Sequence, residues 1–230
     1  SRYEIMNQPL IIFDSDGVLV ESEPIVFKFL VEHCAASGLE ISSEQAYEAF
    51  LGKPIADIAR VAGETFGHEI APIELLNFQI KLLTAFRTDL APVEGISTAL
   101  SSINLAKCVA SSSNMARIRR SLSLTGLEDF FGEHVFSTDL VARGKPHPDV
   151  FLHAAHVMGA APEDAVVIED SPAGIKAAKA AGMRVIGYYG ARHAAPAKLK
   201  DRLASLEPDL LIDDMGKLPH AIQTLMAKTH

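Results

Sequence analysis

The chain has 230 residues, of which 48% are hydrophobic, and a formal net charge of −8 at pH 7. This length suits one large domain or a core with a smaller companion, and the negative charge disfavours nucleic acid and anionic membranes as partners. The sequence contains neither a run of about 18 apolar residues nor the N-terminal pattern of a signal peptide, so we expect a cytoplasmic protein with no membrane segment.

The first predicted element is a short apolar strand, Leu10 to Phe13, of the kind that is buried on both faces of a parallel sheet. Two carboxylates, Asp14 and Asp16, follow it at once, and Gly17 then lets the backbone turn sharply. Open α/β sheets bind ligands beyond the carboxyl ends of their strands. Two acids this close repel each other unless a cation or a proton lies between them. The stretch is therefore either a solvated acidic turn or part of a cation site.

Residues 21–90 have helical periodicity, interrupted by glycine and proline, and contain no strand pattern. We predict four helices there, over residues 21–38, 43–51, 54–66 and 72–87. Three aromatic side chains at helical spacing are expected in the core: Phe27, Phe50 and Phe78. In the fourth helix, the positions expected to face inward are Ile73, Leu76, Ile80, Leu83 and either Ala85 or Phe86.

From residue 91 onward, helices alternate with short β-rich runs. Strands are predicted over 106–110, 135–136, 165–168, 184–187 and 210–212. Helices are predicted over 94–103, 115–124, 148–158, 172–181 and 218–226. The alternation predicts an α/β fold with a doubly wound parallel sheet. Its Rossmann-like core would comprise residues 1–20 and 91–230, with an all-helical domain inserted over residues 21–90.

Further polar side chains are predicted at the ends of other strands. Ser111 follows the second strand, Glu169 and Asp170 follow a later one, and Lys145 lies between them in a segment that Pro146 keeps extended. Parallel strands bring their carboxyl ends to one edge, so these groups can converge with the first two acids. Carboxylates bind Mg²⁺, lysine and metal neutralise a transferring phosphoryl group, and a carboxylate can attack phosphorus. The pattern indicates Mg²⁺-assisted phosphoryl transfer.

Four stretches together resemble the motifs of the haloacid dehalogenase superfamily, in the order and at the separations typical of it. They are residues 14–19 (DSDGVL), 109–113 (VASSS), 144–151 (GKPHPDVF) and 166–174 (VVIEDSPAG). The resemblance covers essentially the whole chain. It is to the branch with a helical cap after the first motif, which includes β-phosphoglucomutase-like proteins and bacterial sugar phosphatases.

This resemblance implies roles for the residues of the first three motifs. Asp14 would attack phosphorus and bind Mg²⁺. Asp16 would protonate the leaving oxygen and later activate water, while its backbone carbonyl binds the metal. Ser111 and the backbone N–H of Ser112 would hold the phosphoryl oxygens, and Lys145 would bridge the nucleophile and the phosphate.

Other implied roles have plain alternatives. Asp170 would complete the metal site, with Glu169 binding directly or through water. Ser113 and Asn114 would either contact the substrate or merely cap a helix. Lys53 lies between Gly52 and Pro54, where the helices of the cap are interrupted, and would either contact the substrate or be an ordinary surface lysine. Two histidines in predicted loops are expected to be solvated: His147 and His193.

Asp16 argues against two other activities found in this superfamily, because its dehalogenases and phosphonatases lack an acid at this position. β-Phosphoglucomutase remains an alternative, although Val26 and Ile55 stand where such mutases typically carry histidine and arginine. A non-catalytic protein on the same fold is a remoter alternative. The resemblance implies a Mg²⁺-dependent phosphatase acting through an aspartyl-phosphate. Its partner would be a small phosphorylated sugar or sugar acid, such as 6-phosphogluconate, and the oligomeric state stays open.

Overall fold

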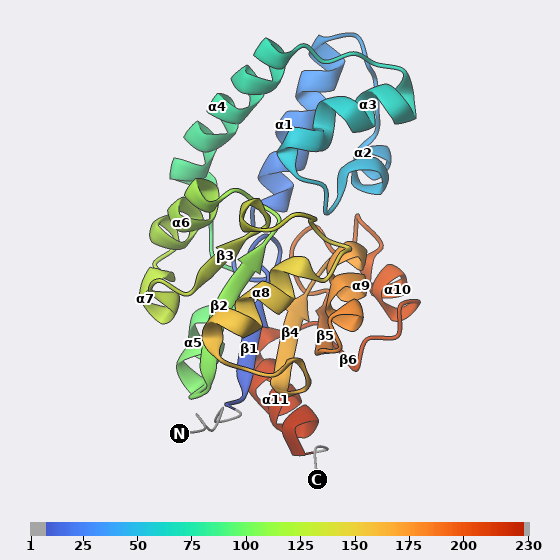
Figure 1. The fold of residues 1–230 in the computed structure, drawn as a ribbon. Helices are drawn as coiled ribbons and strands as arrows, with labels where there is room; N and C mark the ends of the chain where they lie inside the picture. The colour runs from blue at the N-terminus through green and yellow to red at the C-terminus, as the bar shows by residue number, and fades with distance from the viewer. Residues whose placement is uncertain (1–7, 228–230) are drawn as a thin grey trace.

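The computed structural model describes residues 8–227, so residues 1–7 and 228–230 of the predicted core range lie outside the described part. Six parallel strands form one sheet in the order β3-β2-β1-β4-β5-β6 (Figure 1). Their bounds are β1 (Leu10–Phe13), β2 (Ala106–Ser111), β3 (Val135–Ser137), β4 (Ala165–Glu169), β5 (Arg184–Tyr188) and β6 (Leu210–Ile212). β1 lies between β2 and β4, and the chain winds outward from it in both directions. The predicted doubly wound parallel sheet is confirmed.

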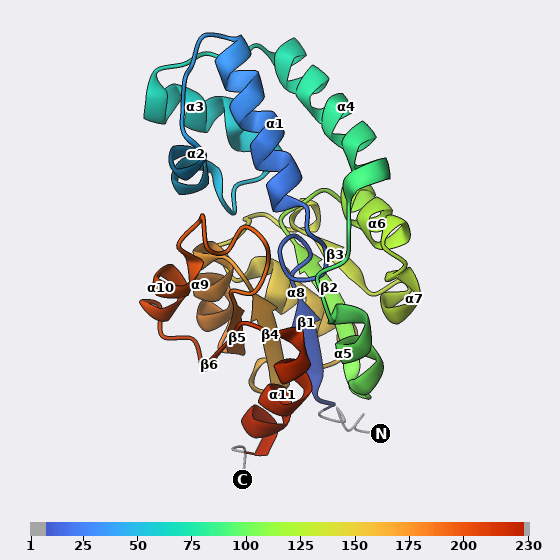
Figure 2. The same ribbon diagram turned by 180° about the vertical axis from the view of Figure 1, so that it is seen from behind.

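Helices cover both faces of this sheet, because successive side chains of a strand point to opposite faces. Ile11 and Phe13 belong to one apolar cluster, which includes residues of α5 (Ile96–Ser102), α6 (Met115–Leu124), α7 (Glu128–Phe131) and α11 (Leu218–Ala227). Leu10 and Ile12 belong to the opposite cluster, with residues of α8 (Asp149–Met158), α9 (Pro172–Ala180) and α10 (Leu199–Ala204). Figure 1 shows α8 and α9 in front of the sheet, and Figure 2 shows α5 and α11 on its other face. Both α7 and α10 are short and were not predicted.

Four further helices pack together beyond the carboxyl ends of the strands (Figures 1 and 2). They are α1 (Glu23–Ala36), α2 (Ser43–Phe50), α3 (Ile58–Phe66) and α4 (Pro72–Asp89). Short 3₁₀ turns are η1 (Ile55–Asp57), η2 (Thr138–Leu140), η3 (Pro162–Asp164) and η4 (Met215–Lys217). We call residues 21–90 the helical block. No helix within residues 8–227 is long and apolar enough to cross a membrane.

Two adjacent chain segments connect the helical block to the sheet. Val20 and Pro92 form an antiparallel bridge. On either side of it, the Glu21 N–H donates to the Ala91 carbonyl at 2.9 Å, and the Val93 N–H donates to the Leu19 carbonyl at 2.9 Å. The entry and exit of the block therefore form a narrow, paired neck.

The predicted inner face of α4 is wrong at its four aliphatic positions, whereas Phe86, one of the two residues expected at its end, is buried. Ile73, Leu76, Ile80 and Leu83 are 41–61% exposed, whereas Phe78, Leu82 and Phe86 are buried. Apolar side chains occupy two faces of this helix, so periodicity alone did not identify the inner one. The buried face packs mainly against α1 and carries two of the bulky aromatic side chains, which bury more apolar surface than aliphatic ones. The expected burial of Phe27, Phe50 and Phe78 is confirmed.

Candidate active site

The site begins in the sharp turn after β1. The Asp14 N–H donates to the Ile168 carbonyl at 3.0 Å and so extends the pairing of β1 with β4. Gly17 has φ +80°, and a Cβ there would lie 2.0 Å from a carboxylate oxygen of Asp170. Only glycine fits this close approach, which brings the first turn against the end of β4.

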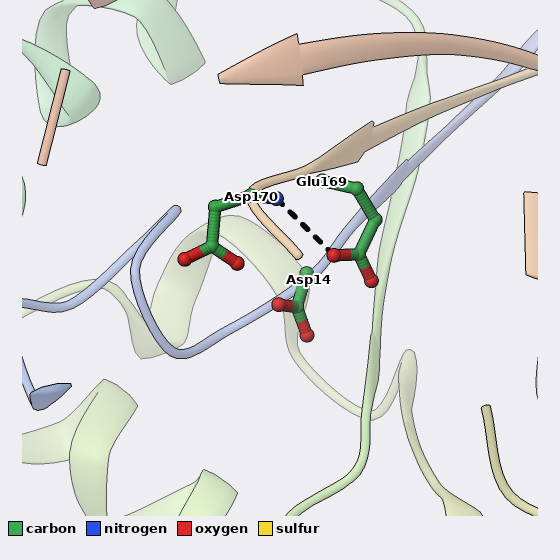
Figure 3. A group of neighbouring side chains, drawn as sticks. All are labelled: Asp14, Glu169 and Asp170. Atoms are coloured by element: carbon green, nitrogen blue, oxygen red, sulfur yellow. Dashed lines mark hydrogen bonds between the residues drawn. The ribbon is translucent and has the colours of Figure 1, made fainter. Parts of the chain in front are cut away.

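Three buried carboxylates meet at this place: Asp14 from the end of β1, and Glu169 and Asp170 from the end of β4 (Figure 3). Their nearest oxygens all lie within 4.8 Å of one another. Burial, followed by the nearby charge of Glu169, raises the pKa of Asp14 and of Asp170 well above the usual range. Both shifts arise because burial and the like charge of Glu169 disfavour the ionised form, and Lys145 offsets them only in part. The cluster therefore suits a metal ion.

Lys145 supplies part of the missing positive charge. Its Nζ donates to Asp14 at 3.0 Å, to Glu169 at 2.5 Å and to the Ala110 carbonyl at 3.1 Å. Burial alone would lower the pKa of Lys145, but the two carboxylates outweigh it and raise that pKa, so the side chain stays an ammonium. One ammonium does not balance three carboxylates, and a divalent cation would do so.

Glu169 differs from the two aspartates in having both oxygens already engaged. One accepts from Lys145, and the other from the N–H of Asp170 at 3.1 Å, the N–H of Ser171 at 3.3 Å and the Ser171 hydroxyl at 3.1 Å. Asp14 and Asp170 line an open cavity, and Glu169 does not. A metal ion would therefore be held mainly by the aspartates, with Glu169 fixing Lys145.

Asp16 is not a member of this cluster, and its carboxylate is held by three donors. It accepts from Ser22 at 2.5 Å, Ser113 at 2.6 Å and Arg117 at 3.0 Å. Burial opposes ionisation of Asp16, but Arg117 and the two hydroxyls outweigh burial and lower the pKa. Asp16 is thus a carboxylate here. Ser22 and Arg117 were not predicted as site residues, and nothing in the sequence separates Arg117 from Arg119 and Arg120 nearby.

The residues after β2 also reach the cavity. Ser111, Ser112, Ser113 and Asn114 all line it. The Ser111 hydroxyl accepts from the Ser113 N–H at 3.1 Å. The Asn114 side chain caps α6 by accepting from the Arg117 N–H at 2.8 Å, so the structural role foreseen for Asn114 is present. Lys53 lines the cavity from the helical block and is exposed.

The expectation that His193 is solvated is wrong. The residue is 1% exposed, its Nε2 lies 3.1 Å from an oxygen of Asp170, and its ring stacks on Tyr47 of α2. Burial lowers the pKa of His193, which favours a neutral ring able to donate to the carboxylate. The loop that carries it folds beneath the helical block, a contact that no local sequence pattern reveals. His147 is exposed, as expected.

A cavity of about 360 Å³ lies between the strand ends and the helical block. The block contributes Glu23, which sequence reasoning missed, and both Val26 and Ile55. Burial and then the charge of Asp16 raise the pKa of Glu23 to about 8, so this carboxyl holds its proton at pH 7. The volume suits a small molecule.

Residues 11–188 match the haloacid dehalogenase-like hydrolase family, and the chain belongs to it. The 6-phosphogluconate phosphatase of Escherichia coli (strain K12) is 27% identical over 81% of this chain and 85% of its own length. A haloacid dehalogenase-like protein of unknown function from Agrobacterium tumefaciens has a TM-score of 0.84 and 35% identity over 96% of this chain and 100% of its own. A family hydrolase from Deinococcus radiodurans R1, solved with bound phosphate and sodium, has a TM-score of 0.75. It is 28% identical over 95% of this chain and 96% of its own.

Proposed function

We propose that this hydrolase is a Mg²⁺-dependent phosphatase that removes phosphate from a small phosphorylated sugar or sugar acid through an aspartyl-phosphate on Asp14. The observation that carries the proposal is the meeting of Asp14, Lys145 and Ser111 at one end of a cavity, with Asp16 beside them. The relatives support the reaction class, since one of them is named a 6-phosphogluconate phosphatase.

In the first half-reaction, an oxygen of Asp14 bonds to phosphorus and the bond from phosphorus to the leaving alkoxide breaks. Lys145 keeps Asp14 ionised, and Ser111 with the N–H groups at the start of α6 holds the phosphoryl oxygens. Mg²⁺, held by Asp14 and Asp170, would offset the negative charge of the phosphoryl group. Asp16 donates a proton to the departing oxygen, so that the product leaves as an alcohol.

In the second half-reaction, Asp16 takes a proton from water, and the water oxygen bonds to phosphorus as the bond to Asp14 breaks. Phosphate leaves and Asp14 is restored. The carboxylate of Asp16, with its lowered pKa, is in the ionisation state for this second step. For the first step Asp16 must leave Ser22 and Arg117 and take up a proton from solvent, a change that we assign to closure of the helical block as a cap over the sheet.

A phosphomutase is the second reading of the same core, and the cavity does not favour it. Val26 and Ile55, at the positions considered for a sugar-orienting histidine and arginine, both line the cavity and offer no hydrogen bond. A mutase must hold one sugar in two orientations while keeping its phospho-enzyme. Side chains without donors favour release of the product and hydrolysis instead.

The test is phosphate release from p-nitrophenyl phosphate and from 6-phosphogluconate, with Mg²⁺ and after its removal by a chelator. We expect hydrolysis that stops on chelation and returns with added Mg²⁺. Asp14→Asn should abolish turnover and the acid-stable incorporation of labelled phosphate into protein. Undiminished turnover in the metal-free protein, or in Asp14→Asn, would overturn the proposal.

A further inference from the structure

The two sides of the cavity differ in chemistry. The sheet side supplies carboxylates, hydroxyls, the Asn114 amide and three basic side chains, which are Lys145, Arg117 and Arg120. The helical block supplies an almost wholly apolar roof, to which every helix of the block contributes. Among the lining residues of the block, only Glu23, Lys53 and Gln79 carry a polar side chain. Apolar positions from α1, α2, η1 and α4 include Val26, Leu30, Phe50, Ile55, Leu82 and Leu83.

The apolar roof constrains what can be enclosed beneath it. A hydroxyl that loses water without gaining a partner costs roughly tenfold in affinity. The roof has three polar side chains, and Lys53 among them is exposed. A chain bearing a hydroxyl on every carbon would therefore leave several hydroxyls unpaired there. Alkyl or aryl surface would instead gain from burial.

We infer that the preferred substrate is an amphiphilic phosphate monoester, with its phosphate at the strand ends and an alkyl or aryl end under the roof. The inference rests on the proposed phosphatase function and narrows it. A sugar derivative qualifies only if the part far from its phosphate is deoxygenated or carries an apolar substituent. The distribution of polar groups carries this assignment: charged at the floor, where phosphorus reacts, and apolar above.

The first experiment uses n-alkyl phosphates from ethyl to hexyl, with 6-phosphogluconate as the polar comparison. The leaving alcohols of the alkyl series have nearly equal acidity, so the chemical step is constant and kcat/KM reports contact with the roof. We expect kcat/KM to rise about three- to fourfold per methylene until the cavity is filled, and to exceed that for 6-phosphogluconate. A flat or falling series, with 6-phosphogluconate as the better substrate, would overturn the inference.

The second experiment places a hydroxyl in the roof at constant size. Val26→Thr should lower kcat/KM for hexyl phosphate about five- to tenfold and that for ethyl phosphate less than twofold. Val157→Thr, the same change on an exposed side chain of α8, should alter neither. Thermal unfolding curves that match the wild type would show that each variant is folded. If folded Val26→Thr loses kcat/KM equally for both esters, the proposed contact between the roof and the alkyl chain is contradicted.

The two proposals fail in different ways. If p-nitrophenyl phosphate is hydrolysed but kcat/KM does not depend on the length of the n-alkyl chain, only the inference of an amphiphilic substrate is contradicted. If no ester releases phosphate in the presence of Mg²⁺, both the proposed phosphatase function and the inference that rests on it are contradicted.

Discussion

The environment of Asp16 shows how one side chain is tuned by residues from distant parts of the chain. Ser22 comes from the neck of the helical block, while Ser113 and Arg117 come from the segment after β2. The Arg117 guanidinium also lies 5.3 Å from the centre of the Phe86 ring, in the last turns of α4. Movement of the block would therefore change the donors around Asp16, and with them its readiness to carry a proton.

Replacement of Asp16 should affect poor leaving groups most. Asp16→Asn removes proton transfer, which is typically worth about 10²–10⁴-fold in rate. We expect kcat to fall by that order with an alkyl or sugar phosphate, and by much less with p-nitrophenyl phosphate, because nitrophenolate leaves without a proton. The measurement is kcat for both esters in the wild type and the variant. Equal losses on both would contradict the acid role.

At the scale of single elements, the start of α9 is fitted closely to the carboxylate cluster. The Ser171 side chain caps this helix by accepting from the Gly174 N–H at 3.0 Å. The same hydroxyl donates to Glu169. A Cβ at Gly174 would lie 1.9–2.2 Å from the carboxylate of Glu169. Only glycine at position 174 therefore allows the helix to approach the acid this closely.

Gly174→Ala should therefore destabilise the protein, although alanine normally favours a helix. Glu169 would have to move and loosen its contact with Lys145, and overpacking of this kind costs about 1–3 kcal/mol. The matched control is Gly63→Ala in α3, where the nearest atom to an added Cβ is 3.9 Å away. That exposed helical site should gain about 0.5–1 kcal/mol. Urea unfolding measures both, and a stable, fully active Gly174→Ala would contradict the packing argument.

The turn between α2 and η1 provides a second prediction at this scale. Lys53→Ala should lower kcat/KM for 6-phosphogluconate about ten- to a hundredfold, as for a lost charge-assisted hydrogen bond, and change p-nitrophenyl phosphate much less. Lys28→Ala, an exposed lysine of α1 outside the cavity lining, is the control. If both esters suffer alike, Lys53 acts in folding or closure, and if neither does, it is a surface lysine.

At the scale of the whole molecule, the helical block is attached by its paired neck and also rests on a loop of the sheet layer. Ala194, Ala197 and Leu199 belong to the apolar cluster of the block. His193 of the same loop lies between Tyr47 of α2 and Asp170 of the acidic cluster. The position of the block and the geometry of the acidic cluster are therefore linked through one loop.

Metal binding should be visible in stability, because the cluster exists only in the folded protein. At 100 times its dissociation constant, Mg²⁺ would add about 2.7 kcal/mol, which raises Tm by roughly 5–10 °C for a chain of this size. Asp170→Asn should lose this shift. Asp213→Asn, at an exposed carboxylate paired with Lys217, should keep it. An unchanged Tm with Mg²⁺ in the wild type, or an equal shift in Asp170→Asn, would contradict the metal site.

Much of the fold could be predicted from local patterns. Met115 to Leu124 and Leu210 to Ile212 form elements with the predicted bounds, and the other sheet strands differ by one residue at one end or not at all. Strand ends at Asp14, Ser111 and Glu169 do meet, because parallel pairing brings their carboxyl ends to one edge. Short helices such as α10 escaped prediction because they have too few turns to show a period.

The sequence by itself determined the parallel sheet, the inserted helices and the converging acids, since each depends on neighbouring residues or on the direction of strand pairing. Only the tertiary structure decided which face of α4 is buried, that His193 lies against Asp170, and that Ser22 and Arg117 hold Asp16. Arg117 and Asp16 are 101 positions apart. Contacts of this kind follow from how whole layers pack, and the physical reason they escape a linear pattern is that no short run of residues encodes them.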